Sequence, residues 1–133
     1  MQRANISDVH KLANMLKAMY QEISPLASNE DKKYEQLAEK HIKEDYVYLL
    51  DDKAFYIVKD VSVPVIDRKM WDGVSVYIKP EYRKGRALSS MYKHMFKTFD
   101  GDIIGMVEPN SEHLPVVAKR HTLVGYLYKM NRS

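Results

Sequence analysis

Residues 74–88 read VSVYIKPEYRKGRAL, and this stretch decides the fold. VSVYI at 74–78 is rich in β-branched and aromatic residues, which predicts a strand. From Pro80 onward, apolar residues at three-to-four spacing predict a helix that ends at Asp100-Gly101, with Gly101 as the C′ residue. DIIGMV at 102–107 then predicts a second strand. A strand, a helix and a strand in this order predict a parallel pair with a right-handed crossover.

Two amphipathic helices are predicted before this unit. Apolar residues at helical spacing follow Ser7 as far as Pro25, and a second such stripe follows Ser28 as far as Ile42. Each serine stands where an N-cap residue is expected, and proline ends the first helix.

The remaining segments predict strands, a loop and one more helix. VYLL at 47–50 and AFYIV at 54–58 flank three polar residues, which predicts a hairpin. Residues 60–73 are broken by proline and glycine and predict a loop or an irregular edge strand. A short helix at 111–121 and a strand at 122–130 close the chain.

These elements predict a mixed α/β (α+β) fold. Its central sheet is expected to be mainly antiparallel with one parallel pair, and to be flanked by about four helices. The chain has 133 residues, of which 45% are hydrophobic and 29% charged, as is typical of a folded protein rather than a disordered one. We expect one domain over residues 1–133.

Composition excludes several classes of site. The chain has no cysteine, which rules out disulfides, thiolate nucleophiles and cysteine-ligated metals. The histidines show no spacing typical of a metal site, so no metal is expected. No apolar run approaches the ~18 residues of a membrane helix. MQRANISDVHKL at the start lacks the apolar segment of a secretory signal, so we expect a cytoplasmic protein with no membrane partner.

Positive charge gathers around the start of the predicted crossover helix. The net charge is +3, but residues 79–97 hold six Lys or Arg and one acidic residue. Cations in a first helical turn oppose the helix dipole, whereas a bound anion would satisfy both the cations and the unpaired N–H groups. Gly85 would let the backbone approach that anion closely. The stretch therefore predicts either a site for a small phosphorylated ligand or a solvated basic helix.

The same residues resemble a known motif. VYIKPEYRKGRALSSMYKHMF, from Val76, is similar to the cofactor-binding motif of the GNAT superfamily of N-acetyltransferases, in which a strand ending in V-x-P-x-Y-R leads to the loop R-x-x-G-x-G/A. RANISDVHKLANML at 3–16 resembles the opening strand and helix of that family. EPNSEHLPVVAKRHTLVGYLYKM at 108–130 resembles its closing Asn, helix and strand. The Gly85-Arg86 form of the loop looks most like the short GNAT-like proteins of bacteriophages.

This resemblance implies acetyl-CoA as the cofactor. Main-chain groups of two strand residues would contact the pantetheine arm and the thioester carbonyl, across a splay between the parallel strands. Main-chain N–H groups and cations of the loop would hold the pyrophosphate. The cofactor-binding residues implied are Val76, Ile78, Arg83, Lys84, Gly85, Arg86, Ala87, Leu88 and Asn110.

The implied activity is acetyl transfer to an amine by direct attack in a ternary complex. The acceptor is open among a small molecule, a peptide N-terminus and a lysine side chain. Glu108 is the candidate base, His113 a candidate for proton transfer, and Tyr128 or Tyr126 a candidate acid. For each of them the alternative is a solvated or packing role. Glu22 is expected either to meet a cationic amine or to be a solvated helix-end charge.

Two positions depart from the family pattern and favour an alternative. Leu88 stands where Gly or Ala is usual, and Val117 stands where a Tyr acid is usual, seven residues after the Asn. The alternative is a catalytically weak or inactive GNAT-fold protein of phage type, acting as a binding, virion or host-inhibitor protein. Nucleic-acid binding is not favoured, because most aromatics near the basic stretch fall on the apolar side of the helix. The sequence leaves open whether the protein forms a homodimer.

Overall fold

The structure is a computed structural model, and it describes residues 1–105 and 130–131. The chain forms five strands, three α-helices and two short 3-10 helices in this described part. The strands are β1 (Gln2–Arg3), β2 (Tyr46–Leu50), β3 (Ala54–Asp60), β4 (Met70–Ile78) and β5 (Asp102–Ile104). The helices are η1 (Ile6–Asp8), α1 (Val9–Ile23), α2 (Asp31–Glu44), η2 (Pro80–Tyr82) and α3 (Ala87–Thr98).

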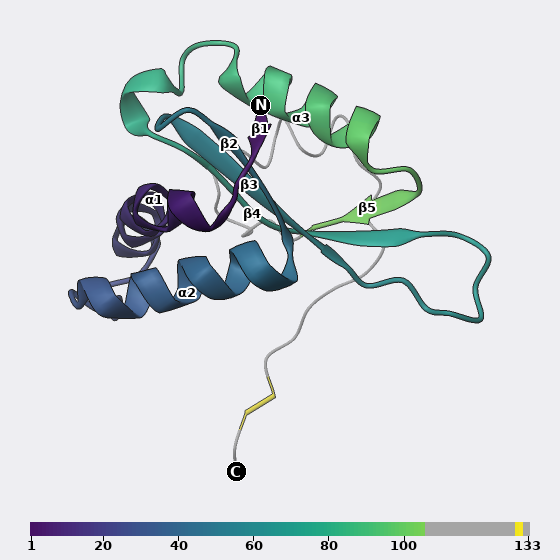
Figure 1. The fold of residues 1–133 in the computed structure, drawn as a ribbon, viewed down its shortest axis with the longest axis horizontal. Helices are drawn as coiled ribbons and strands as arrows, with labels where there is room; N and C mark the ends of the chain where they lie inside the picture. Colours follow the sequence, from purple (N-terminus) through teal and green to yellow (C-terminus); the bar gives the residue numbers. More distant parts are fainter. Residues whose placement is uncertain (106–129, 132–133) are drawn as a thin grey trace.

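The strands form one sheet in the order β1-β2-β3-β4-β5. The first four are antiparallel to their neighbours, whereas β4 and β5 are parallel. The predicted hairpin, the parallel pair and the mixed α/β class are therefore confirmed. Figure 1 shows α1 and α2 against one face of the sheet and α3 against the other. It also shows the loop between β3 and β4 extending beyond the helical layers.

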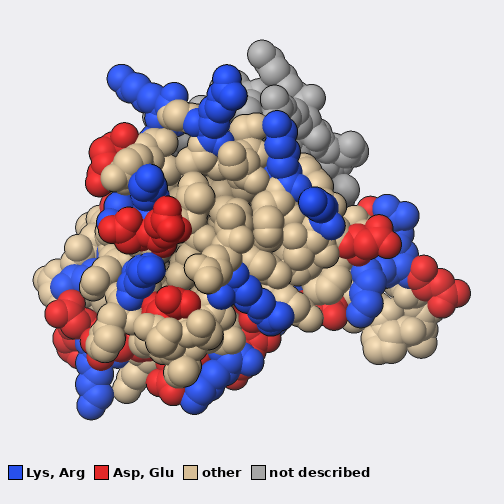
Figure 2. Space-filling view, turned by 45° about the horizontal axis from the view of Figure 1, so that its top comes forward, with Lys and Arg blue, Asp and Glu red and all other residues tan. Residues whose placement is uncertain are grey.

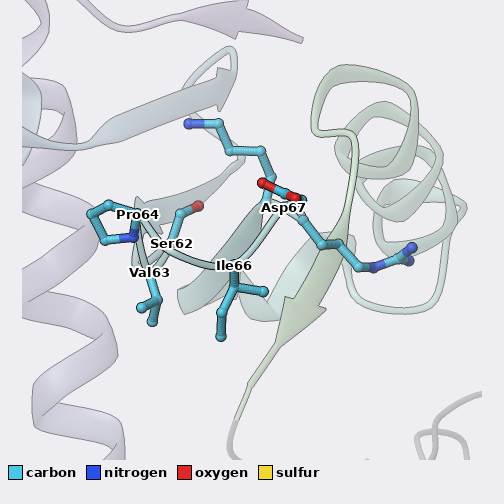
Figure 3. Close-up of a pocket in the computed structure, with 7 residues that line it drawn as sticks. Ser62, Val63, Pro64, Ile66 and Asp67 are labelled. Atoms are coloured by element: carbon cyan, nitrogen blue, oxygen red, sulfur yellow. The ribbon is translucent and has the colours of Figure 1, made fainter.

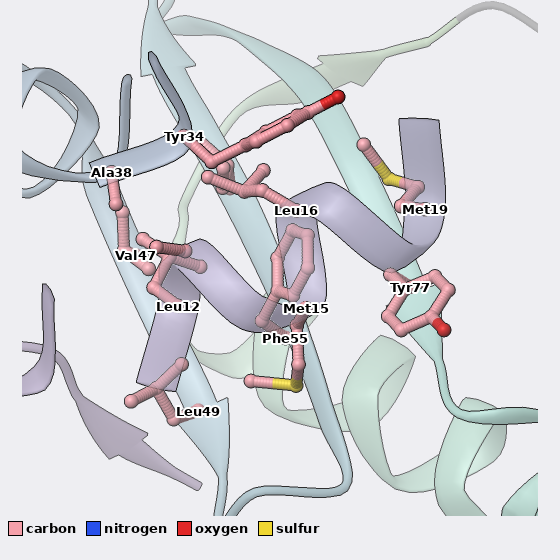
Figure 4. Close-up of a cluster of buried hydrophobic side chains, with 12 residues drawn as sticks. Leu12, Met15, Leu16, Met19, Tyr34, Ala38, Val47, Leu49, Phe55 and Tyr77 are labelled. Carbon is pink, nitrogen blue, oxygen red and sulfur yellow. The ribbon is translucent and has the colours of Figure 1, made fainter. Parts of the chain in front are cut away.

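The first core cluster fills the space between the sheet and the α1–α2 pair (Figure 4). Leu12 and Leu16 from α1 are fully buried there against Val47 and Phe55 of the sheet. Most of the apolar residues predicted to form a stripe between Ser7 and Pro25 are buried, as expected. Ile23, its last member, is instead 68% exposed, because α1 ends there, beyond the layer that the sheet covers.

The second cluster lies between the sheet and α3 and is rich in aromatic rings. Phe99 packs edge-to-face against Trp71, with centroids 5.0 Å apart, and against Tyr46 at 5.4 Å. Met91 and Met95 of α3 are buried over this group. β3 serves both clusters, since its residues alternate between the two faces and Ala54–Val58 are all fully buried.

Helix starts differ from the predictions. Asn5, not Ser7, caps the first helical segment: its side chain accepts from the Ser7 N–H while Asp8 accepts from the Asn5 N–H. Ser28 accepts from the Glu30 N–H and so orders the turn before α2 rather than capping α2 itself. Both differences are local, because a polar side chain can satisfy a turn just before a helix as well as the helix start.

The start of β4 and the end of α3 differ from the bounds predicted from the sequence. β4 begins at Met70, so residues 61–69 alone form the loop. Gly101 has a positive φ of 116°, a conformation that favours glycine. The prediction that it is the C′ residue is wrong by one position, because Phe99 is the C-cap of α3. The predicted helix at 111–121, and all but the last residue of the predicted strand at 122–130, lie outside the described residues. No helix in the described part is long and apolar enough to cross a membrane.

Candidate functional site

The second half of β4 has an open edge in the described part of the chain. β5 pairs with β4 only through Met70–Asp102, Trp71–Ile103 and Asp72–Ile104. Beyond these pairs the two strands part, and no described strand pairs with residues 74–78 on that side. Opposite β3, the register shifts so that Val74 is the extra residue of a β-bulge. Val74 and Val76 are 40% and 37% exposed.

Backbone groups of Val76 and Ile78 point toward this open edge. The Lys79 N–H donates to the Lys53 carbonyl across the β3–β4 pair at 2.9 Å. Hydrogen-bonded and non-hydrogen-bonded pairs alternate in an antiparallel ladder, so Val76 and Ile78 fall in non-bonded pairs. Their N–H and C=O groups therefore face away from β3. The Ile78 carbonyl accepts from Nε of Arg83 at 2.8 Å.

β4 leads through η2 into a tight turn at residues 83–86, which we call the basic turn. The prediction that a continuous helix begins at Pro80 is wrong, since η2 ends at Tyr82 and α3 begins at Ala87. Glycine is a poor helix former and three cations oppose the dipole of a helix start, which explains the interruption. The Gly85 N–H bonds to the Tyr82 carbonyl at 3.4 Å, a turn contact of the i, i+3 type.

The basic turn presents both donors and charge. Lys84, Gly85 and Arg86 are exposed. Arg86 occupies the N-cap position of α3 without a capping side-chain bond, so no described side chain accepts from the first N–H groups of the helix. No acidic residue lies between Glu81 and Asp100 in the sequence. Figure 2 shows Lys and Arg without Asp or Glu at the upper centre, toward α3. N–H donors beside exposed cations suit an anionic ligand.

Among the described residues, the Gly85 position leaves room for a Cβ. A Cβ built there would lie 3.7 Å from the Tyr82 carbonyl oxygen, an ordinary contact distance. Gly101, rather than Gly85, is the described glycine with a positive φ. The described part of the chain therefore gives no steric reason for a glycine at this position, whereas a ligand that approaches the backbone closely would give one.

Leu88 faces the core rather than the basic turn. Together with Ala87 it packs against the second cluster, under the first turn of α3. The large side chain at the position where the family usually has Gly or Ala is thus accommodated by the aromatic core. The Leu88 side chain therefore does not cover the backbone of the basic turn.

Arg83 is held by Glu22 at the end of α1. The guanidinium Nη1 and Nη2 lie 2.5 and 2.7 Å from the two carboxylate oxygens, and the guanidinium carbon lies 5.7 Å from the ring centre of Tyr77. The hydrogen bond from Arg83 lowers the pKa of Glu22, and burial raises the pKa of Tyr77. The cation that Glu22 meets is therefore in this chain. Sequence reasoning missed this pair, since 61 positions separate its members and no local pattern joins them.

Trp71, near the start of β4, has a structural role. It is buried and its Nε1 donates to the Asp100 carbonyl at 2.8 Å, so it anchors the core. No group of three or more His, Asp or Glu in the described part could hold a metal ion.

The remaining site predictions fall where the structure gives no description. They are Glu108, Asn110, His113, Tyr126 and Tyr128, together with the Val117 position. All of them lie outside the described residues.

Two surface hollows lie away from the basic turn. One, of about 310 Å³, lies within the β3–β4 loop and is lined by Ser62, Val63, Pro64, Ile66, Asp67, Arg68 and Lys69 (Figure 3). It lies at the start of β4, whereas the basic turn follows the end of that strand. The other, of about 340 Å³, lies between the end of α1 and the start of α2, with Tyr20, Tyr34 and Lys33 among its lining residues.

Comparison with known proteins finds matches among solved structures alone. The sequence matches no protein-family model and no curated protein. Solved structures do match. A possible acetyltransferase from Clostridium difficile 630 has a TM-score of 0.73 and 13% identity, covering 98% of this chain and 97% of its own. A ribosomal-protein-alanine N-acetyltransferase from Brucella melitensis biovar Abortus 2308 has a TM-score of 0.66 and 15% identity, covering 99% and 96%.

A third match was solved with a ligand. It is a predicted acetyltransferase from Clostridium acetobutylicum, crystallised with acetyl-CoA, with a TM-score of 0.70 and 12% identity, covering 98% of this chain and 94% of its own. At these identities the likeness concerns the fold alone. The chain has the GNAT acetyltransferase fold, with its parallel β4–β5 pair and the turn that follows β4.

Proposed function

We propose that the chain is an acetyl-CoA-dependent N-acetyltransferase. The observation that carries this proposal is the open edge of β4 running directly into the basic turn. A long ligand with an amide-rich arm and a pyrophosphate needs a row of backbone groups followed by an anion site, in that order. The residues present fit this ligand: Val76 and Ile78 offer backbone groups, and Lys84 and Arg86 offer exposed charge.

When bound, acetyl-CoA supplies an acetyl group activated as a thioester. The N–H groups of the basic turn and of the first turn of α3 would hold its pyrophosphate, with Gly85 leaving room for it. The open edge of β4 would align the pantetheine arm. We keep Asn110 as a further cofactor contact. Glu108, His113 and Tyr128 are kept as candidates for receiving and returning the proton when an amine is acetylated.

The finer assignments are proposals from the sequence. The acceptor is an amine of a small molecule, a peptide N-terminus or a lysine. The Gly85-Arg86 pair favours the bacteriophage-type subgroup, and a cytoplasmic location remains part of the proposal.

The proposal is tested by calorimetric titration of the full chain with acetyl-CoA. We compare the wild type with Gly85→Glu, which places a carboxylate in the basic turn at a position whose Cβ meets only an ordinary contact. The matched control is Gln36→Glu, an equal charge change at an exposed position of α2. Saturable binding that is weakened at least tenfold by Gly85→Glu and kept by Gln36→Glu is the expected result. A wild type that gives no heat and no thermal stabilisation with millimolar acetyl-CoA would refute the proposal. A cofactor at about 100 times its Kd should stabilise the fold by roughly 2.7 kcal/mol.

A further inference from the structure

We propose that Glu22 is a positioning residue for the cofactor, because it holds Arg83 and thereby fixes the basic turn in the shape that receives the pyrophosphate. This inference rests on the proposed function and adds to it. In this inference Arg83 fixes the basic turn through its bonds to Glu22 and Ile78, whereas the family resemblance implied that Arg83 contacts the phosphates directly.

Each guanidinium nitrogen of Arg83 has a partner within the chain. Nε donates to the Ile78 carbonyl at 2.8 Å, and Nη1 and Nη2 donate to Glu22 at 2.5 and 2.7 Å. A planar guanidinium that binds both oxygens of a carboxylate is fixed in direction as well as in place. The Arg83 side chain is 30% exposed and the Glu22 side chain 41%, so the pair is partly shielded from solvent.

These contacts join three elements around the proposed site. Glu22 belongs to the end of α1, Ile78 is the last residue of β4, and Arg83 is the first residue of the basic turn. One side chain therefore ties the strand that would align the pantetheine arm to the turn that would bind the pyrophosphate. Backbone N–H groups bind an anion well only when they are already correctly directed, so fixing Arg83 would increase affinity without any contact between Arg83 and the ligand.

Charge alone predicts the opposite effect of Glu22. A carboxylate close to an anion site repels the ligand, so removing its charge should strengthen binding. The same result is expected if Arg83 must leave Glu22 in order to contact the phosphates, because the glutamate then competes for it. Only the positioning role predicts that the neutral Glu22→Gln variant binds more weakly. The sign of the change therefore decides between these roles.

The experiment is calorimetric titration of the full chain with coenzyme A and, by displacement, with pantetheine, which lacks the pyrophosphate. The variants are Glu22→Gln and, as the matched control, Asp102→Asn. Asp102 accepts a similar two-bond contact from Arg68, at 2.9 and 2.7 Å, but at the start of β5 and away from the basic turn.

We expect Glu22→Gln to weaken coenzyme A binding about tenfold and to leave pantetheine binding unchanged, and we expect Asp102→Asn to leave the binding of both ligands unchanged. Equal or tighter coenzyme A binding by Glu22→Gln would overturn the positioning role and leave the proposed function standing. Equal loss for both ligands would also overturn it, as a general structural defect. A wild type that does not bind coenzyme A would remove the proposed function and this inference with it.

Discussion

Tyr56 and His94 form a polar contact inside the α3 side of the molecule. The Tyr56 hydroxyl lies 2.6 Å from Nδ1 of His94. The Tyr48 ring stacks on Tyr56 and makes a tilted contact with His94. Burial lowers the pKa of His94, with smaller contributions from the charged N-terminus and Lys97, and burial also raises the pKa of Tyr56. Both groups are therefore neutral near pH 7, and the tautomer of the His94 imidazole decides which of the two donates the hydrogen bond.

This pair predicts a loss of stability in mild acid. The pKa of His94 is lower in the folded protein than its ordinary 6.5, so the unfolded chain binds more protons just below pH 6.5. The contribution of His94 is therefore present above pH 6.5 and is lost as the pH falls from there through the lowered pKa. Urea unfolding between pH 7.5 and 5 should show this decrease. The decrease should be smaller in His94→Asn, whose amide can still form a hydrogen bond with Tyr56 but does not titrate.

The control for replacing an imidazole is His10→Asn, at a side chain that is 82% exposed. A wild-type free energy of unfolding that falls no more steeply than that of His94→Asn would contradict the assignment. In that case other groups would account for the whole pH dependence.

At the scale of elements, the sequence predicted what local patterns determine. The stripes of α1 and α2 are periodic over many residues, and the hairpin follows from two short apolar runs on either side of three polar residues. These elements are as predicted. The start of α3 was misplaced because its apolar spacing continues the helical pattern through a turn that charge and Gly85 interrupt. The pairing of Glu22 with Arg83 could not be predicted, because it depends on how α1 packs across β4 and not on any sequence spacing.

The connection between α3 and β5 predicts a strict glycine requirement. Gly101 has a φ of 116°, and a Cβ added there would lie 2.4 Å from the backbone carbonyl oxygen of Lys69. That carbonyl also accepts from the Asp102 N–H at 3.0 Å, so it cannot retreat without breaking the start of the parallel pair. Gly101→Ala should lower the free energy of unfolding by about 1–3 kcal/mol, measured by urea denaturation.

Gly85→Ala is the matched comparison, since its new Cβ meets only an ordinary contact at 3.7 Å. It should change stability by less than about 0.5 kcal/mol. Under the proposed function, it should nevertheless weaken acetyl-CoA binding, so the two glycines separate a folding requirement from a ligand requirement. Similar losses of stability in both variants would show that the basic turn is as strained as the connection.

At the scale of the whole molecule, one strand couples two cores. β3 contributes Phe55 and Ile57 to the α1–α2 cluster, and Tyr56 and Val58 to the α3 cluster. All four side chains are fully buried, so neither face of the strand can lose its cover without exposing apolar surface. We therefore expect the two helical layers to unfold together.

Leu12→Ala tests this coupling. Leu12 is fully buried in the α1–α2 cluster, and truncation of such a residue costs about 2–5 kcal/mol. Trp71, the only tryptophan in the chain, belongs to the other cluster, so its fluorescence reports on the α3 side. Leu12→Ala should lower the urea midpoint of Trp71 fluorescence and of far-ultraviolet circular dichroism by the same amount. Met91→Ala, from the α3 side, should also move both midpoints together. A Leu12→Ala variant whose dichroism midpoint falls while that of Trp71 stays at the wild-type value would show that the two layers unfold independently, and that β3 does not transmit the loss from one face of the sheet to the other.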